Sequence, residues 1–382
     1  MRILQVHSSL NACGGAEKVA LYSIKAFLER GHEIVLDVKE KTDWERVNRI
    51  MGVNLEGKIK ERVQPKEIKF RRFMLYQNLY HSSRRSLNLL REVEFDVKFH
   101  TSGGNLFLLP EITYVHDLQA NLRDINSKYR KSLFWRFYSE PYHLLKSPLN
   151  AILNRGYIIV NSTFTANFLR NYLSKSLVIY PPVEVEDLAP TLSNDRREAS
   201  VLSIGRLSPE KNWHFLPLIA SKMRDINFYL LASRQREQDE YRQKLLELKE
   251  RFKTDNLTII VDPPYRYKLK MLGRCKVLLH LCPYEPFGLA VAEGMASGLI
   301  PVVHRTGGQW IDILNYGNYG FSYKQITMDE ISKNIRRALK AWCYNEALRV
   351  AKSANRFSAK RFTNKITSII ENCKSKVSKI GF

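Results

Sequence analysis

The chain of 382 residues has 44% hydrophobic and 26% charged side chains, which is typical of folded globular proteins and excludes wholesale disorder. This length is sufficient for two domains of ordinary size. The 61 Lys and Arg residues against 38 Asp and Glu give a formal net charge of +23, so we expect an anionic partner or anionic surroundings.

The cysteines and the apolar runs indicate the compartment. Five cysteines are present, an odd number without any C-x-x-C pair, which rules out a zinc ribbon and a disulfide framework and fits a reducing compartment. The N-terminal MRILQVHSS is typical of a first strand rather than of a signal peptide. No run approaches the roughly 18 to 20 apolar residues that a membrane-spanning helix needs. We therefore expect a cytoplasmic protein, soluble or peripheral on the cytoplasmic membrane face.

Short β-branched runs alternate with amphipathic stretches along the first half of the chain, as in a parallel sheet covered by helices on both faces. We predict a strand at residues 3–7, a glycine-containing loop, and a helix at residues 16–30 that ends at Gly31. The remaining strands of this half are predicted at residues 33–38, 96–100, 113–116, 157–161 and 177–180.

A domain boundary is predicted at the YPP sequence of residues 180–182, because two consecutive prolines continue neither a strand nor a helix. After an acidic and polar stretch the alternation restarts. Strands are then predicted at residues 201–204, 227–232, 257–261, 277–281 and 301–303. The sequence therefore predicts an α/β protein with two consecutive Rossmann-like sheets.

The first candidate binding loop is NACGGAE at residues 11–17, between the first strand and the first helix. Gly14 and Gly15 would let the backbone approach a ligand, and the helix N-terminus offers unsatisfied N–H groups to an anion. The loop does not match G-x-G-x-x-G, so the dinucleotide fingerprint fails. Taken alone, a tight turn without function is an equally good interpretation.

The second candidate loop is GRLSPEKN at residues 205–212, directly after the predicted strand at 201–204. Ligands of doubly wound sheets bind beyond the carboxyl ends of the strands. Arg206 can grip a diphosphate as a fork and Lys211 as a point charge. Two solvated cations in a basic protein are the alternative, but the position after a strand favours binding.

The third candidate loop, YEPFGLAVAEGMASG at residues 284–298, carries the strongest signal. We predict that a helix starts near Pro286, because proline suits a first helical position. The N–H groups of Phe287, Gly288 and Leu289 would then lack helical partners. These groups can face a hydroxyl-rich or anionic ligand.

Two glutamates frame this third loop, Glu285 in the loop and Glu293 about two turns into the predicted helix. Their separation places them along one ligand rather than together as the acid and base of a glycosidase. A glutamate at a helix start can be a mere dipole partner, but two glutamates around one loop favour binding. Gly298 is predicted to end the helix.

Weaker signals come from single residues and a short turn. His116 ends a predicted strand in YVHD, although a lone histidine is more often structural. TGG at residues 306–308 also follows a strand and could bring backbone N–H groups to a phosphate. The sequence has no Asp-x-Asp metal–diphosphate motif. Arg, Lys and helix ends would therefore bind any phosphate.

Taken together and in this order, the motifs resemble the retaining glycosyltransferases of family four, which have the GT-B fold of two Rossmann-like domains facing each other across a cleft. The likeness spans nearly the whole chain, and the Glu-x7-Glu element is highly specific. Residues 11–19, 161–165 and 178–182 are most similar to GDP-mannose-dependent α-1,2-mannosyltransferases that extend lipid-linked oligosaccharides. The chain departs from that branch in its shorter glycine run, and from many family members at Trp310 and Asp312.

The resemblance implies roles on the donor side. Arg206 and Lys211 would hold the donor diphosphate and stabilise the charge that develops on it as it leaves. Glu293 would bind the ribose hydroxyls. Gly14 and Gly15 would lie beside the phosphates and the acceptor.

The resemblance also implies roles around the transferred sugar. Glu285 and the N–H groups of Phe287, Gly288 and Leu289 would hold that sugar, and His116 would contact it from the N-terminal domain. Retention would proceed by a front-face displacement in which the leaving diphosphate helps to deprotonate the acceptor hydroxyl. No metal and no cofactor beyond the nucleotide-sugar co-substrate, by preference GDP-mannose, is expected.

The resemblance further implies the domain division. Residues 1–182 together with a last helix at about 357–382 would form the acceptor-binding domain, and residues 183–356 would form the donor-binding domain. The acceptor would be a glycan or a lipid-linked glycan. Closure around the donor would be a hinge motion near residues 181–182.

Residues 58–91 are strongly basic, with ten basic and two acidic side chains. Aromatic and leucine side chains recur there at helical spacing among Arg71, Arg72, Arg84 and Arg85. Such a helix can lie on anionic lipid, although a helix that faces the core with solvated arginines is equally consistent. We expect peripheral membrane binding through this segment.

Other functions remain open at this point. The same fold with a UDP- or ADP-sugar donor could serve a soluble sugar acceptor. A basic nucleic-acid-binding protein is a distant alternative, because no recognisable nucleic-acid module is present; no specific nucleic acid is expected as a partner. An epimerase or phosphorylase would share the architecture, but the chain is short for a typical phosphorylase.

Overall fold

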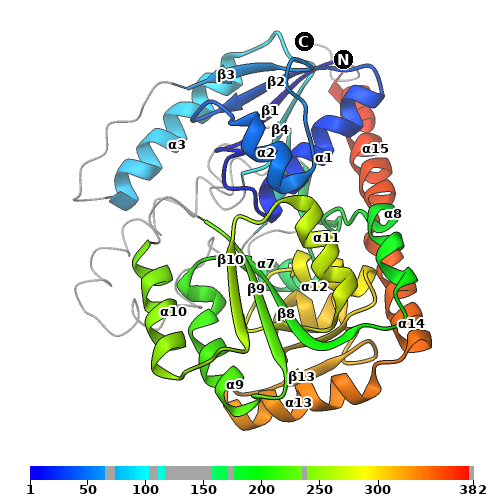
Figure 1. The fold of residues 1–382 in the computed structure, drawn as a ribbon. Coiled ribbons are helices and arrows are strands. Elements are labelled where there is room, and N and C mark those ends of the chain that lie inside the picture. The colour runs from blue at the N-terminus through cyan, green and yellow to red at the C-terminus, as the bar shows by residue number, and fades with distance from the viewer. Residues whose placement is uncertain (65–73, 103–110, 117–156, 171–175, 235–238, 378–382) are drawn as a thin grey trace.

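Two parallel β-sheets, each covered by helices, lie one above the other (Figure 1). This computed structural model describes residues 1–64, 74–102, 111–116, 157–170, 176–234 and 239–377. Among these residues, every pairing of neighbouring strands within the two sheets is parallel. The prediction of two Rossmann-like sheets is therefore confirmed.

The N-terminal sheet has seven strands in the order β3-β2-β1-β4-β5-β6-β7. Its strands are β1 Arg2–Val6, β2 Glu33–Val38, β3 Lys60–Val63, β4 Val97–His100, β5 Ile112–Val115, β6 Tyr157–Val160 and β7 Leu177–Val178. Because the order reverses between β1 and β4, the loops after these two strands flank a topological switch point, where ligands bind in such sheets.

The C-terminal sheet has six strands in the order β10-β9-β8-β11-β12-β13. Its strands are β8 Glu198–Arg206, β9 Asn227–Ser233, β10 Leu257–Val261, β11 Cys275–His280, β12 Ile300–His304 and β13 Phe321–Tyr323. The order reverses between β8 and β11, so the second and third candidate loops follow neighbouring strands at the switch point of this sheet.

Helices connect and cover the strands. Those near the N-terminal sheet are α1 Gly15–Glu29, α2 Trp44–Met51, α3 Met74–Arg91, α7 Thr163–Leu169 and α15 Ala359–Val377. Those of the C-terminal half are α8 Val185–Leu188, α9 Leu216–Lys222, α10 Asp239–Arg251, α11 Tyr265–Arg274, α12 Leu289–Ala296, α13 Met328–Ala341 and α14 Tyr344–Ala354. Three helices, α2, α7 and α13, have side-chain N-caps. Asp43, Ser162 and Thr327 respectively accept hydrogen bonds from backbone N–H groups in the first turn of these helices.

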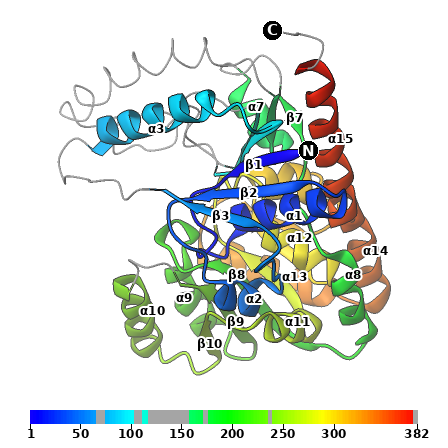
Figure 2. The same cartoon turned by 90° about the horizontal axis from the view of Figure 1, so that it is seen from above.

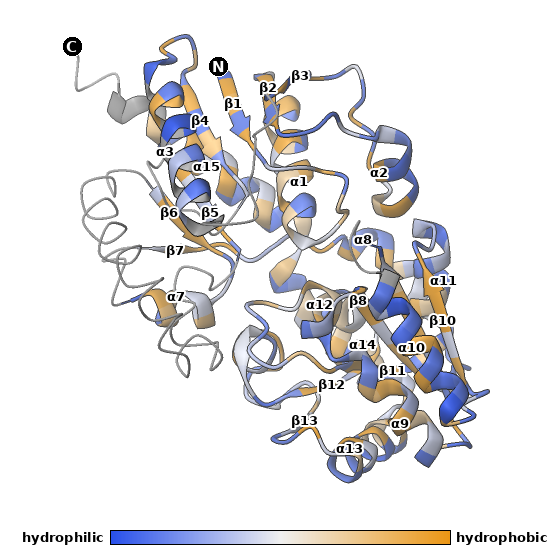
Figure 3. Cartoon of the chain, turned by 90° about the vertical axis from the view of Figure 1, so that its left-hand side faces the viewer, coloured by the Kyte–Doolittle hydropathy of each residue, from blue (hydrophilic) through white to orange (hydrophobic). Residues whose placement is uncertain are grey.

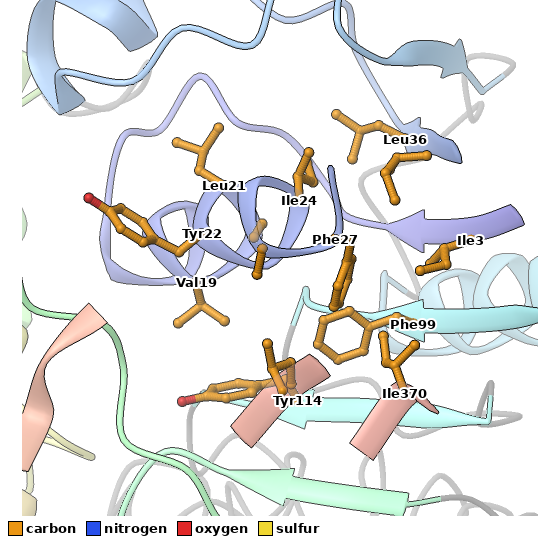
Figure 4. Close-up of a cluster of buried hydrophobic side chains, with 14 of the residues drawn as sticks. Ile3, Val19, Leu21, Tyr22, Ile24, Phe27, Leu36, Phe99, Tyr114 and Ile370 are labelled. Atoms are coloured by element: carbon orange, nitrogen blue, oxygen red, sulfur yellow. The ribbon is translucent and has the colours of Figure 1, made fainter. Parts of the chain in front are cut away.

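The last helix returns to the N-terminal sheet, so the chain crosses between the domains twice. Val183 donates its N–H to the carbonyl of Phe357 at 2.9 Å, and Ala359 donates to the carbonyl of Val183 at 2.8 Å. Beyond this crossing, Ile366 and Ile370 of α15 are buried in one cluster with Phe27 of α1. Figure 4 shows Ile370 and Phe27 in this cluster. Figure 2 shows α15 at one side of the N-terminal sheet and α3 at the other.

Hydropathy follows this layering. The strand β1 carries mostly hydrophobic residues, whereas the outer helices α2 and α10 carry many hydrophilic ones (Figure 3). Among the described residues, no helix combines the length and the apolar character needed to cross a bilayer.

The third candidate loop differs from the sequence prediction, because α12 begins at Leu289 and not near Pro286. Gly288 precedes the helix with a φ of +101°, a left-handed conformation that glycine adopts without strain. The loop therefore stays non-helical for three more residues, 286–288, before the helix starts. The edge strands β3 and β13 were not predicted.

Replacing Ile366 by Ala tests whether α15 is an integral part of the N-terminal core. Ile366 is fully buried there, so we expect a loss of about 2–5 kcal/mol in the free energy of unfolding. Lys365 is exposed on the same helix, and its change to Ala is the matched control. Chemical denaturation followed by circular dichroism measures both, and equal midpoints for the two variants would contradict the packing described.

Candidate functional site

Loops that follow strands of one sheet meet loops that follow strands of the other. A Cβ at Gly14, in the loop after β1, would lie 3.9 Å from Cδ of Arg206 at the end of β8. A Cβ at Gly15 would lie 3.8 Å from Cδ2 of Leu289 at the start of α12. The first candidate loop thus faces the second and third, and the structure brings residues predicted from both halves together.

Lys211 and Glu285 form a mostly buried ion pair between the second and third candidate loops. His280, at the end of β11, lies with Nε2 3.0 Å from Oε2 of Glu285. Burial lowers the pKa of this imidazole, so it is neutral near pH 7 and Nε2–H donates to the carboxylate. His280 was missed by the sequence analysis, although it stands at a strand end five residues before Glu285.

The ion pair sets the charge of both partners. Burial by itself would raise the pKa of Glu285, but Lys211 and the bond from His280 outweigh burial and hold that pKa well below its usual value. Burial would likewise lower the pKa of Lys211, but the Glu285 carboxylate raises it overall. Both groups are therefore charged at neutral pH, and together they offer a cation and an acceptor to a polar ligand.

The TGG turn supports the Glu285 loop, and the N–H groups of Thr306 and Gly308 already have backbone acceptors. Gly308 donates its N–H to the carbonyl of Glu285 at 2.8 Å. A Cβ at Gly308 would lie 2.2 Å from the carbonyl oxygen of Pro286, so only glycine permits this close approach. The N–H of Gly308 is therefore already bonded, and the structure does not support the phosphate contact considered for it.

The start of α12 carries the predicted donor groups. Val291 and Ala292 both donate to the carbonyl of Gly288. In the described part of the chain, the N–H groups of Phe287, Gly288 and Leu289 have no backbone acceptor outside the regular helix bonds. These three N–H groups lie next to Glu285, where they can meet hydroxyl or phosphate oxygens of a ligand.

Arg206 is more exposed than the Lys211–Glu285 pair. Its side chain is 44% exposed, and it contacts Glu210 at 3.4 Å. An exposed surface pair of this kind contributes little to stability, so the guanidinium can exchange Glu210 for an anionic ligand at small cost.

His116 follows β5 and is tied to the neighbouring strand ends. Its Nε2 lies 3.0 Å from the carbonyl oxygen of Thr101, which can only accept a hydrogen bond, so Nε2 carries the proton. Burial lowers the pKa of His116 to about 4. The imidazole is therefore neutral at pH 7, and its Nδ1 is an acceptor for a hydroxyl rather than an acid.

Glu17 and His7 form a second linked pair that the sequence analysis missed. Glu17 accepts the N–H of Gly14 at 2.7 Å and lies 3.5 Å from Nε2 of His7. This contact fixes the glycine loop at the start of α1. The signal was present, because Glu17 stands at the N3 position of a helix, where a carboxylate reaches back to the N-cap N–H.

Glu293 lies in a separate buried cluster instead of beside Glu285. Its carboxylate is 2.7 Å from Nζ of Lys18 and 3.2 Å from Nζ of Lys268. Burial opposes ionisation, but these two ammonium groups lower the pKa of Glu293 to about 2. Lys18 and Lys268 were not predicted as site residues.

A second interdomain contact explains the departure noted at Asp312. Its carboxylate accepts the N–H groups of Thr163 at 2.8 Å and Phe164 at 3.2 Å, at the start of α7. Tyr180 adds a hydrogen bond at 3.1 Å. Asp312 therefore links the two domains by hydrogen bonds.

One described group of side chains has the spacing of metal ligands, namely His280, Cys282 and Glu285, whose ligand atoms lie within 4.8 Å of one another. Burial raises the pKa of the Cys282 thiol to about 12, which opposes the thiolate that a metal needs. Lys211 already supplies a positive charge to Glu285. These residues therefore fit a polar organic ligand better than a cation.

The histidine signals of the protein should reveal the neutral state of His116. With a pKa lowered from 6.5 to about 4, its side-chain NMR resonances should not titrate between pH 8 and 5.5. His116→Gln identifies these resonances. Because the pKa of His116 is lower in the folded than in the unfolded chain, this histidine contributes fully to stability above pH 6.5, and the contribution is lost as pH falls toward 4. His116→Gln should therefore also flatten the pH dependence of the free energy of unfolding between pH 6.5 and 4. A titration midpoint near 6.5 would contradict the assignment.

Residues 185–372 match the protein-family model described as "Glycosyl transferases group 1". Among curated proteins, the chain is 27% identical over 271 residues to the GDP-Man:Man(3)GlcNAc(2)-PP-Dol alpha-1,2-mannosyltransferase of Neurospora crassa, covering 64% of this chain and 49% of that protein. The protein of the same name from Dictyostelium discoideum is 26% identical, with 63% and 51% covered. The chain thus spans about half the length of the curated relatives it matches.

Solved structures show the fold. A glycosyltransferase from Rickettsia africae aligns with a TM-score of 0.69 and 16% identity, covering 97% of this chain and 98% of its own. HepE of Anabaena in complex with UDP and glucose aligns with a TM-score of 0.66 and 16% identity, covering 99% of each chain. The resemblance expected from the motifs is thereby confirmed: residues 185–372 match the model of the glycosyl transferases group 1 family, and the two sheets with their helices together adopt the GT-B fold.

Proposed function

We propose that this protein is a retaining glycosyltransferase that transfers mannose from GDP-mannose to a lipid-linked glycan. The observation that carries the proposal is the arrangement of Lys211, Glu285 and the N–H groups at the start of α12, all beyond the carboxyl ends of β8 and β11. The names of the relatives favour GDP-mannose as donor and a lipid-linked oligosaccharide as acceptor.

The chemistry follows from the charges of this site. Cleaving the bond between sugar and diphosphate leaves negative charge on the diphosphate, and Arg206 with Lys211 would stabilise that charge. Because two cations of the chain can take this role, we propose that no metal is required. The leaving diphosphate would help to deprotonate the acceptor hydroxyl on the face from which it departs.

The transferred sugar would lie between the two domains. Glu285, held in place by Lys211 and His280, would accept hydrogen bonds from its hydroxyls, as would the neutral Nδ1 of His116. Glu293 would bind the ribose of the nucleotide. We accordingly propose residues 183–356 as the donor-binding domain and residues 1–182 with the last helix as the acceptor-binding domain.

Nucleotide binding tests the donor. In thermal unfolding with GDP, UDP and ADP and their common sugar conjugates, we expect GDP and GDP-mannose to stabilise the protein, by about 2.7 kcal/mol at a hundredfold excess over the dissociation constant. Lys211→Met should lose this shift and its turnover, because it removes the cation from the diphosphate site. Glu285→Gln should retain the GDP shift and lose turnover.

The matched control is Lys222→Met, which removes an exposed lysine paired with Asp329 on the outer surface. This variant should keep both the shift and the turnover. Stabilisation by UDP or ADP compounds alone would discard the mannosyltransferase assignment. Unchanged turnover in Lys211→Met would overturn the site.

We also propose that one face of α3 binds an anionic membrane surface, which would place the protein at the cytoplasmic face of a membrane. Tyr80 is 61% and Leu87 is 50% exposed, and Arg84 and Arg91 are exposed with them. The spacing 80, 84, 87 and 91 puts all four on one helical face. Apolar and cationic groups on one face suit a lipid interface.

Not every arginine of the basic segment belongs to the outward face of α3. Nη2 of Arg85 lies 2.6 Å from Oδ1 of Asp37 on β2, so this arginine faces the sheet and not the solvent. Arg85, which the sequence analysis included in the basic segment, is therefore left out of the proposed lipid-binding face, because it pairs with a buried carboxylate. Arg71 and Arg72 lie outside the described residues.

Charge reversal of the outward face tests the membrane proposal. Arg84→Glu with Arg91→Glu should weaken cosedimentation with phosphatidylserine vesicles at least about tenfold, because each cation near the surface contributes about 1 kcal/mol. Lys333→Glu with Lys340→Glu makes the same change of net charge on exposed positions of α13, which lies far from α3 (Figures 1 and 3). Equal losses for both double variants would show that net charge alone is responsible.

A further inference from the structure

Three buried charged side chains and one partly buried lysine meet where the two domains touch, and we name them the interdomain charge cluster: Lys18, Glu184 and Glu293, with Lys268 partly buried. Lys18 comes from α1 of the N-terminal domain, whereas Lys268 and Glu293 come from α11 and α12 of the other domain. Glu184 stands just after the proline boundary and precedes α8. The cluster has two cations and two anions.

Lys18 holds the centre of the cluster. Its Nζ lies 2.6 Å from Oε2 of Glu184 and 2.7 Å from Oε1 of Glu293, and its side chain is only 4% exposed. From the same helix, Tyr22 donates to Glu184, and Tyr265 donates to Glu184 at 3.2 Å. Burial would lower the pKa of Lys18, but the two carboxylates raise it overall, so the ammonium is charged.

The distribution of these charges between the domains is unequal. The C-terminal side of the boundary carries Glu184, Glu293 and Lys268, which sum to one negative charge. Only Lys18, reaching in from α1, makes the buried cluster neutral. Because an unbalanced buried charge is costly, contact between α1 and α12 is favoured whenever Glu293 is ionised and buried.

Resting on the proposed function, we propose that Lys18 is a positioning residue that couples contact between the two domains to donor binding, by fixing the carboxylate of Glu293 from the opposite domain. Glu293 is the group proposed to bind the ribose. The Glu293 carboxylate is held from both domains only when the domains are in contact. The nucleotide therefore binds best to the form in which the domains are in contact.

The lysine contacts leave one hydrogen-bond acceptor position of Glu293 unoccupied. A carboxylate has about four lone-pair positions. Oε1 of Glu293 accepts from Lys18 and Lys268, whereas Oε2 contacts Lys268 at 3.3 Å. The one remaining lone pair, on Oε2, can accept a ribose hydroxyl without displacing either lysine, and the lysines would then orient the carboxylate rather than compete with the ligand.

Two variants, one at Lys18 alone and one in which a second substitution restores charge balance, distinguish a positioning role of Lys18 from a purely stabilising one. Lys18→Met leaves the cluster with one net negative charge, so it should lower the melting temperature. Adding Glu184→Gln leaves Lys268 with Glu293, a neutral pair, and should recover the melting temperature. If Lys18 positions Glu293, affinity for GDP should stay reduced in the double variant, because Glu293 still lacks its contact from α1.

The experiment measures melting temperature, GDP affinity by calorimetry, and kcat and KM for GDP-mannose in wild type, Lys18→Met, Lys18→Met/Glu184→Gln and Tyr22→Phe. We expect GDP affinity about tenfold weaker in both Lys18 variants, as when the binding-competent state falls to about a tenth. KM should rise more than kcat falls. Tyr22→Phe, which removes a bond to Glu184 from the same helix and leaves Lys18 in place, should keep the affinity of wild type.

The outcomes that overturn the inference are distinct from those that overturn the function. Recovery of both melting temperature and GDP affinity in the double variant would show that Lys18 is only structural. Unchanged GDP affinity in Lys18→Met would also overturn the coupling. If Lys18→Met does not fold, the double variant decides alone. Wild type is measured first, and failure of wild type to bind any nucleotide would overturn the proposed function and this inference together.

Discussion

Two buried carboxylates in one loop-and-helix segment impose the main constraint on this structure, because each needs a cation from another part of the chain. Glu285 obtains Lys211 from the loop after β8. Glu293 obtains Lys268 from α11 and Lys18 from the opposite domain. The first pairing organises a site within the C-terminal domain, and the second extends to α1, so the position of α1 depends on the same segment.

The elements of the sequence that obey local rules could be predicted. Strand β2 at Glu33–Val38 and strand β10 at Leu257–Val261 agree with the predicted ranges residue for residue, because β-branched runs bounded by polar turns leave little choice. The loops that carry Lys211 and Glu285 could be predicted from their position after strands, since parallel strands bring their carboxyl ends to one edge of a sheet. Their mutual contact follows from the neighbouring positions of β8 and β11.

Features that depend on long-range pairing escaped prediction. Lys18 is an ordinary helix residue by sequence, and 275 positions separate it from Glu293, so no local pattern links them. His280 acquires its role from the carboxylate that packs against it. The start of α12 was placed too early because Pro286 suits a helix start, whereas the close approach of Gly308 to Pro286 and the left-handed Gly288 accompany a loop that stays non-helical up to Leu289.

The positive charge of the chain serves two different environments, and α3 shows both on one helix. Arg85 faces inward and pairs with Asp37, which is buried and also contacts Arg62 of β3. Arg84, its neighbour in sequence, faces outward with Tyr80 and Leu87. Successive residues on a helix point about 100° apart, so a run of arginines cannot serve one surface alone. Net charge therefore indicates that an anionic partner is expected, while the helical period decides which arginines remain available to meet it.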